Sequence, residues 1–270
     1  MSWLRDALGG YLPAAWSELL LTPFAAAVDR AGRVVVLPSF GLQALPFHAF
    51  PWRGRPLLAH AEVVYSLDLP VRAGRRPADT GVWVLVVGDP LGDLGGARTE
   101  AEGIVSLLGT SGLNVSTLIG PSAEGPAVRA DLSRARHFHY AGHSASAGPF
   151  GWASTLRLAH DTSLSIADIV ALERVPRTVV LLSCEAGYVS HDPRAQGISL
   201  AAAFVFAGSE AVLAMATPVD EGETPLLAAA FRGEVADGPA LSMMYRTGLL
   251  HLQEGTLSQA AWQGLRLWVP

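Results

Sequence analysis

The stretch VVLLSCEAG, residues 179–187, contains the only cysteine of the 270-residue chain. Its valines and leucines predict a buried strand, and Cys184 follows that strand beside a glutamate and two small residues. A second run, HFHYAGHS at residues 137–144, also predicts a strand and carries His143 close to its end. A buried structural cysteine needs no such setting, whereas a nucleophile at the end of a strand does. These two runs therefore decide how the fold is interpreted.

Strand and helix patterns alternate along the rest of the chain. We expect strands at residues 33–38, 61–67, 82–90, 137–144, 178–184 and 211–219, and helices at residues 97–109, 165–172 and 196–208. Several strands are nearly continuous apolar runs, which is typical of strands covered on both faces. The alternation predicts an α/β fold with a mostly parallel central sheet flanked by helices. In such a sheet, functional residues collect at the carboxyl ends of the strands.

We expect one domain over residues 1–270. Within it, RAGRRPADTG at residues 72–81 is the expected linker between two parts. The first part, residues 1–75, contains an N-terminal strand pair, and the second, residues 76–270, forms the α/β core.

Composition excludes several classes of function. The net charge is −5, all 19 basic residues are arginine, and no basic run occurs, which argues against nucleic acid or an anionic membrane surface as a partner. Without lysine, a Walker-type phosphate site and a Schiff base are excluded. One cysteine forms no internal disulfide, the N-terminus lacks the pattern of a signal peptide, and the most apolar stretch is broken before it reaches the length of a membrane span. We therefore expect a soluble cytoplasmic protein.

The chemistry that the sequence suggests is that of a histidine and a thiol. If the strands before His143 and Cys184 are parallel neighbours, about 4.8 Å apart, the two side chains lie at one edge of the sheet. A histidine near a thiol stabilises the thiolate and can protonate a leaving amine. The alternative is a buried free cysteine and an unrelated hydrogen-bonded histidine.

The order of the motifs resembles the CHAT domain family, caspase-like cysteine peptidases related to separase, caspases and legumain. RVVVLPSFGLQALPFHAF resembles the opening hairpin of the family, and VLVVGDPLGDLGGARTEAEGIVSLL resembles its first core strand and helix. HFHYAGHS and LLSCEAG match its catalytic histidine and cysteine strands. GISLAAAFVFAGSEAVLAMATPVDEGET matches the following helix, strand and acidic turn, and AAWQGLRLWVP resembles its closing aromatic strand.

This resemblance implies a caspase-like fold and a cysteine endopeptidase whose catalytic dyad is His143 and Cys184. It also implies an oxyanion hole formed by the backbone N–H groups of Ser144 and Cys184, no metal or organic cofactor, a protein substrate, and a regulatory sensor or repeat-protein partner. The chain departs from the family at Ser144, where relatives often carry glycine, and in MATPV (residues 215–219), where relatives often have a tryptophan before the proline.

Acidic residues near the expected active edge suggest a pocket for a basic side chain. They are Glu185, Asp220, Glu221 and Glu223. The alternative interpretation of the last three is a solvated loop. A pocket for aspartate would need converging arginines, and the nearest, Arg157 and Arg194, are expected to be isolated in flanking loops.

Three other functions stay open. GHSAS at residues 142–146 suggests a nucleophile elbow with Ser144 as the nucleophile of a serine hydrolase, although its final glycine is missing and helix-hostile residues follow. His137, His139 and His143 suggest a zinc site, but we expect His137 and His139 to be packed and hydrogen-bonded. A caspase-like scaffold that binds partners without cleaving them is the alternative from a different class.

Overall fold

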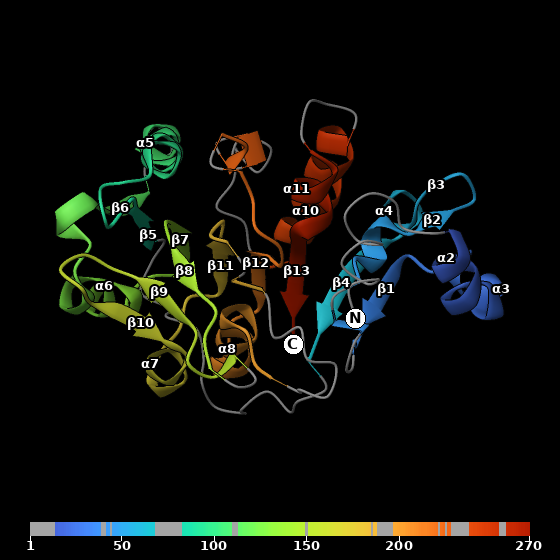
Figure 1. Ribbon diagram of the computed structural model, residues 1–270, viewed down its shortest axis with the longest axis horizontal. Coiled ribbons are helices and arrows are strands. Elements are labelled where there is room, and N and C mark those ends of the chain that lie inside the picture. Colours follow the sequence, from blue (N-terminus) through green and yellow to red (C-terminus); the bar gives the residue numbers. More distant parts are fainter. Residues whose placement is uncertain are drawn as a thin grey trace.

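An eight-stranded sheet runs through the centre of the computed structural model (Figure 1), in the order β1-β4-β13-β12-β11-β7-β5-β6. Its strands are β1 (Arg33–Val36), β4 (Glu62–Ser66), β5 (Trp83–Gly88), β6 (Asn114–Ile119), β7 (His137–Ala141), β11 (Thr178–Leu181), β12 (Ala211–Met215) and β13 (Leu265–Val269). The structure describes residues 14–38, 42–43, 45–67, 83–109, 113–148, 151–184, 186–187, 197–220, 222–224, 226–227, 238–253 and 258–270.

The sheet is mostly parallel, as the alternation of patterns predicts. From β12 through β11, β7 and β5 to β6, every pair of neighbours is parallel. β13 is antiparallel to β12, and β4 and β1 then run parallel to β13. All six expected strands are present, and the run at 137–144 is divided into β7 and a short strand, β8 (Ser144–Ala145).

Burial explains why the central strands are apolar along their whole length. β7 and β12 are buried at every position, and β5 at every position after Trp83. Helices cover both faces, so an inward and an outward side chain both lie away from water. The edge strand β6 was not expected, because its sequence NVSTLI mixes polar and apolar residues and it is only partly buried.

In Figure 1, α5, α10 and α11 lie on one side of the sheet and α6, α7 and α8 on the other. Their bounds are α5 (Gly95–Gly109), α6 (Gly125–Leu132), α7 (Ile166–Ala171), α8 (Leu200–Ala207), α10 (Gly238–Gln253) and α11 (Gln259–Gly264). The three expected helices are α5, α7 and α8. α5 packs very close to β5, because a side chain at Gly88 would overlap Ala101. This contact fixes where the carboxyl end of β5 meets the second turn of α5.

The N-terminal part differs from the expected hairpin. β1 and β4 are parallel neighbours, and β4 joins the main sheet next to β13. The antiparallel hairpin lies later, between β2 (Pro51–Trp52) and β3 (Arg55–Pro56), and short helices surround it. They are α2 (Ala14–Leu20), η1 (Thr22–Phe24), α3 (Ala25–Val28), η3 (Phe47–Ala49) and α4 (Leu57–His60). A parallel pair arises because η3, the hairpin and α4 return the chain to the start of the sheet. The expected linker at 72–81 lies outside the described residues.

A second, three-stranded antiparallel sheet follows β7. It consists of β8, β9 (Thr155–Arg157) and β10 (Ser163–Ser165), in the order β10-β9-β8. With α7 it fills the chain between β7 and β11. β8 begins immediately after His143, so this small sheet holds the backbone at the carboxyl end of β7.

Candidate active site

His143 follows β7 after a single glycine, and its backbone is held from two sides. The N–H of Arg157 donates to the His143 carbonyl at 2.9 Å, and the Tyr140 hydroxyl lies 2.7 Å from the same oxygen. Gly142 allows this turn, because a Cβ there would lie 2.8 Å from both Pro90 Cδ and the Tyr140 hydroxyl. Burial raises the pKa of the Tyr140 hydroxyl, which keeps it a neutral donor. The histidine therefore leaves the sheet in a fixed direction.

Cys184 follows β11, the strand beside β7. Leu181 pairs with Tyr140, and the Leu182 N–H continues the ladder to the Tyr140 carbonyl at 3.2 Å. The thiol is exposed and free, and its Sγ lies 3.8 Å from the Val219 carbonyl in the segment after β12. Cys184 thus stands at the carboxyl edge between β7 and β12, as the sequence predicts.

Ser144 joins the two segments. Its hydroxyl donates to the carbonyl of Cys184 in a close contact, which fixes the His143 and Cys184 segments side by side. Arg157 donates to His143, so residues 143 and 157 form a hydrogen-bonded pair and Ser144 and Leu156 form the next, non-hydrogen-bonded one. The N–H of Ser144 therefore points away from β9, at the outer edge of β8. A glycine at this position would have no hydroxyl and could not make this contact.

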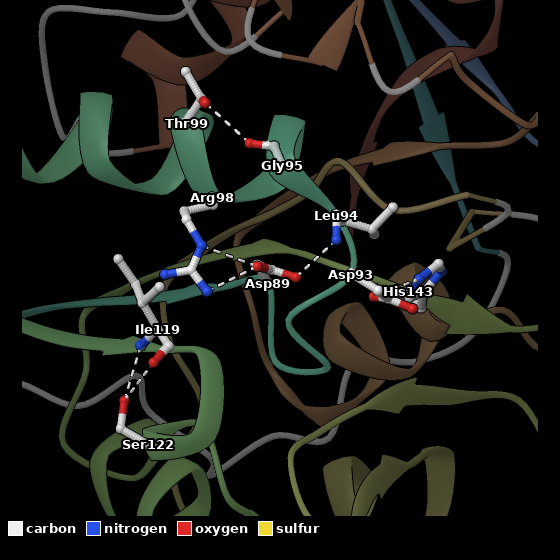
Figure 2. Close-up of polar contacts among 9 residues, drawn as sticks. All are labelled: Asp89, Asp93, Leu94, Gly95, Arg98, Thr99, Ile119, Ser122 and His143. Carbon is white, nitrogen blue, oxygen red and sulfur yellow. Dashed lines mark hydrogen bonds and ion pairs between the residues drawn. The ribbon is translucent and has the colours of Figure 1, made fainter.

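The ring of His143 has a partner that the sequence did not reveal. Its Nε2 lies 3.1 Å from Oδ1 of Asp93, a residue of the loop between β5 and α5 (Figure 2). No hydrogen bond joins His143 to Cys184 among the described residues. The sequence feature that could have revealed Asp93 is GDPLGD at residues 88–93. It is an aspartate-rich turn after β5, the strand that proves to be the neighbour of β7.

Comparison with known proteins agrees with this arrangement. The family model described as CHAT domain matches residues 12–259.

The chain belongs to the CHAT domain family.

The resemblance drawn from the motifs is thereby confirmed over nearly the whole chain. No curated protein matches this CHAT domain in a sequence comparison.

Solved structures similar to the CHAT domain include two of the Saccharomyces cerevisiae separase-securin complex. One match has a TM-score of 0.53 at 14% identity, covering 82% of this chain and 14% of that chain. The other has a TM-score of 0.53 at 12% identity, covering 82% of this chain and 15% of that chain. These matches confirm the caspase-like fold, and the CHAT domain spans about a seventh of the length of those separase chains.

The acidic candidates of the CHAT domain are in different situations. Asp220 is exposed beyond β12, and its Oδ1 accepts the N–H of Gly222 at 2.8 Å. Glu223 accepts two hydrogen bonds from Ser258, from the N–H at 2.5 Å and the hydroxyl at 2.9 Å, just before α11. Its carboxylate is thus engaged in holding the start of that helix. Glu185 and Glu221 lie outside the described residues.

The arginines also differ from expectation in one respect. Arg157 belongs to β9 and shares a backbone hydrogen bond with His143, so it is not isolated in a flanking loop. Sequence separation concealed this, because the antiparallel pairing of β8 and β9 brings residue 157 back to residue 143. Arg194 lies outside the described residues.

The other two histidines of the HFHYAGHS run are packed and hydrogen-bonded, as expected. Nδ1 of His137 contacts the Thr178 hydroxyl closely, and Nε2 of His139 lies 2.5 Å from Oε1 of Glu100. Glu100 is buried in α5, and burial raises the pKa of its carboxyl despite the hydrogen bond from His139. Within the described residues, His, Cys, Asp and Glu side chains form no group of three or more arranged to hold a metal.

Two further observations bear on the alternatives. A nucleophile elbow turns from its serine directly into a helix, whereas Ser144 begins the short strand β8. In the part of the chain that the structure describes, no helix is both long and apolar enough to span a membrane.

Proposed function

We propose that this CHAT domain is a cysteine endopeptidase that cleaves a protein substrate with the dyad His143 and Cys184. The observation that carries the proposal is the adjacency of β7 and β11, whose carboxyl ends present a histidine and an exposed thiol side by side. The joint from Ser144 to Cys184 keeps these segments together. Membership of the CHAT domain family supports the same chemistry.

The proposed reaction has two stages. In the first, the sulfur of Cys184 attacks the scissile carbonyl carbon and its proton passes to His143, which then protonates the leaving amine as the C–N bond breaks. In the second, water attacks the resulting thioester, gives a proton to His143, and releases the new carboxyl end of the substrate with the regenerated thiol. Every atom transferred comes from the thiol, the peptide or water.

The proposed oxyanion hole consists of the backbone N–H groups of Cys184 and Ser144. The outward direction of the Ser144 N–H supports its part, because an N–H bound within the β8–β9 ladder would be unavailable. A donor of this kind contributes roughly 3–4 kcal/mol to the transition state. The Ser144 side chain does not obstruct this role, because its hydroxyl is bound to the Cys184 carbonyl and so does not point freely into the site.

We further propose a specificity, a partner and a setting. Asp220 and Glu221 are the acids that remain for a pocket preferring arginine or lysine before the scissile bond, together with Glu185, which follows Cys184 in the sequence. A regulatory sensor or repeat-protein partner would control access, and the two separase structures, each solved as a complex with securin, support the idea of a protein partner. The enzyme would act without a cofactor, as one domain over residues 1–270, in the cytoplasm.

The test is a cleavage profile over a peptide library, compared between the native chain and Cys184→Ala. Cys184→Ala should abolish turnover and leave the thermal midpoint within a few degrees, because an exposed thiol contributes little to packing. His143→Ala should do the same, whereas His139→Ala should lower the midpoint, because that ring is buried against Glu100. Turnover retained by Cys184→Ala would exclude the mechanism. Absence of turnover in the native chain with every library, alone or with a partner, would favour the non-cleaving scaffold.

A further inference from the structure

We propose that Asp93 is a positioning residue for His143, so that the site works as a Cys–His–Asp unit rather than a dyad. The inference rests on the proposed function for its chemistry and on two separate features for its support. The first is the contact between Asp93 Oδ1 and His143 Nε2 at 3.1 Å (Figure 2), and the second is the way the Asp93 loop is fastened to β7.

The contact decides how the imidazole presents its two nitrogens. A carboxylate only accepts hydrogen bonds, so the Nε2 of His143 must carry a proton in order to donate to Asp93. In the neutral ring, Nδ1 is then the nitrogen that can accept the proton of the thiol. Without a partner, a solvent-exposed imidazole exchanges between both tautomers and several ring orientations. The hydrogen bond to Asp93 favours one tautomer and one ring orientation.

The loop that carries Asp93 is anchored by a second aspartate. Asp89 is buried, has the left-handed φ of 45°, and accepts the N–H of Leu94 at 2.9 Å. Arg98, in the first turn of α5, binds Oδ2 of Asp89 through Nε at 3.1 Å and through its terminal nitrogen at 2.9 Å. These bonds brace the loop on both sides of Asp93.

The same residue ties the loop to the histidine strand. The N–H of Asp89 donates to the carbonyl of Ala141 at 2.8 Å, two residues before His143. The aspartate loop and the histidine segment therefore share one anchor point. A carboxylate placed at random on a mobile loop would lose its contact to solvent, whereas this one starts from a fixed backbone.

Exposure separates a positioning role from a structural one. The side chains of His143 and Asp93 are 42% and 58% exposed, and exposed ion pairs contribute only about 0–1 kcal/mol to stability. Removing the Asp93 carboxylate should therefore leave stability nearly unchanged. The structural alternative is that Asp93, two residues before α5, merely favours the start of that helix through its charge.

The experiment compares Asp93→Asn and Asp93→Ala with the native chain. The control is Glu102→Gln, which removes a carboxylate from an exposed position on α5. The first readout is the rate constant for alkylation of Cys184 by iodoacetamide as a function of pH, with His143→Ala as the reference for loss of the histidine. The chain has one cysteine, so alkylation reports this thiol alone. The second readout is kcat and KM for a peptide from the library profile.

We expect Asp93→Asn to lower kcat by about 10- to 100-fold with little change in KM, and Asp93→Ala to do so at least as strongly. The alkylation profile should move toward that of His143→Ala, because the imidazole is no longer held with Nδ1 available to accept the thiol proton. Glu102→Gln should match the native chain in both assays.

The outcomes separate this proposal from the peptidase assignment. Native cleavage with unchanged profiles in Asp93→Asn overturns the positioning role and leaves the peptidase standing. A native chain that cleaves no peptide, but whose alkylation profile shifts in Asp93→Asn and not in Glu102→Gln, supports the positioning role and overturns the peptidase. Equal profiles for Asp93→Asn and Glu102→Gln overturn the positioning role whether or not the chain cleaves.

Discussion

At the scale of single residues, Asp220 is the described acid whose side chain is free to face a substrate. It is exposed, and within the described residues its carboxylate accepts a single hydrogen bond, from Gly222, which leaves acceptor capacity. Glu223 is engaged with Ser258 and is less suited to this role. The proposed preference for a basic residue before the scissile bond therefore depends mainly on Asp220 and on its undescribed neighbour Glu221.

Asp220→Asn should reduce cleavage after arginine about fivefold to tenfold relative to cleavage after leucine, since an exposed ion pair contributes up to about 1 kcal/mol and burial under a substrate adds to this. The measurement is kcat/KM for matched peptides with Arg, Lys, Asp, Asn or Leu before the bond. Glu223→Gln serves as the comparison and should mainly lower the thermal midpoint, because it weakens the hold on α11. Faster cleavage after Asp than after Arg would point instead to Arg157, which lies beside His143.

At the scale of helices and strands, the contact between α5 and β7 depends on a buried polar pair. Glu100 of α5 is 3% exposed and meets His139 of β7, with the Thr224 hydroxyl as a further donor. Two residues further along α5, Glu102 is exposed.

Glu100→Ala should lower the free energy of unfolding by about 3–5 kcal/mol, because it leaves His139 buried without its partner. Glu102→Ala should change it by less than about 0.5 kcal/mol, as expected of an exposed helix position. Urea unfolding followed by circular dichroism measures both. Similar values for the two variants would mean that the buried pair contributes nothing net.

The elements also show what sequence patterns can and cannot predict. Cys184 and His143 could be placed at one sheet edge because each follows an apolar run, and the runs prove to be neighbours. Asp93 could not be placed, because its position depends on the left-handed backbone of Asp89 and on the bond from Arg98 to Asp89. The position of Arg157 beside His143 could not be predicted for a similar reason, because a two-residue strand such as β8 has no sequence pattern of its own.

At the scale of the whole molecule, stability in mild acid depends on a histidine far from the site. His48 is fully buried; its Nδ1 accepts from the Tyr65 hydroxyl at 2.9 Å and its Nε2 donates to the Trp262 carbonyl at 3.3 Å. Burial, helped by the positive charge of Arg266, lowers the pKa of His48 from 6.5 to about 3. The contacts join the N-terminal part to α11 and so to the rest of the sheet.

Between the two pKa values, the unfolded chain binds one proton at His48 that the folded chain does not. The free energy of unfolding should thus fall by about 1.4 kcal/mol for each pH unit below 6.5, on account of this residue alone. Urea unfolding at a series of pH values measures this slope, and His48→Gln should reduce the slope by about 1.4 kcal/mol per pH unit.

The reversal of direction between β12 and β13 divides the molecule into two rims. The site lies on the rim where β7 and β11 end. β1, β4 and β13 end on the opposite rim, and the loops that lead into β7 and β11 also lie on that opposite rim. A strand of five residues separates the rims by about 16 Å. Glu173, exposed in the loop before β11, lies on the opposite rim. A fluorophore or solid support attached there would leave the approach to Cys184 open, so immobilised forms of the CHAT domain should be built from that side.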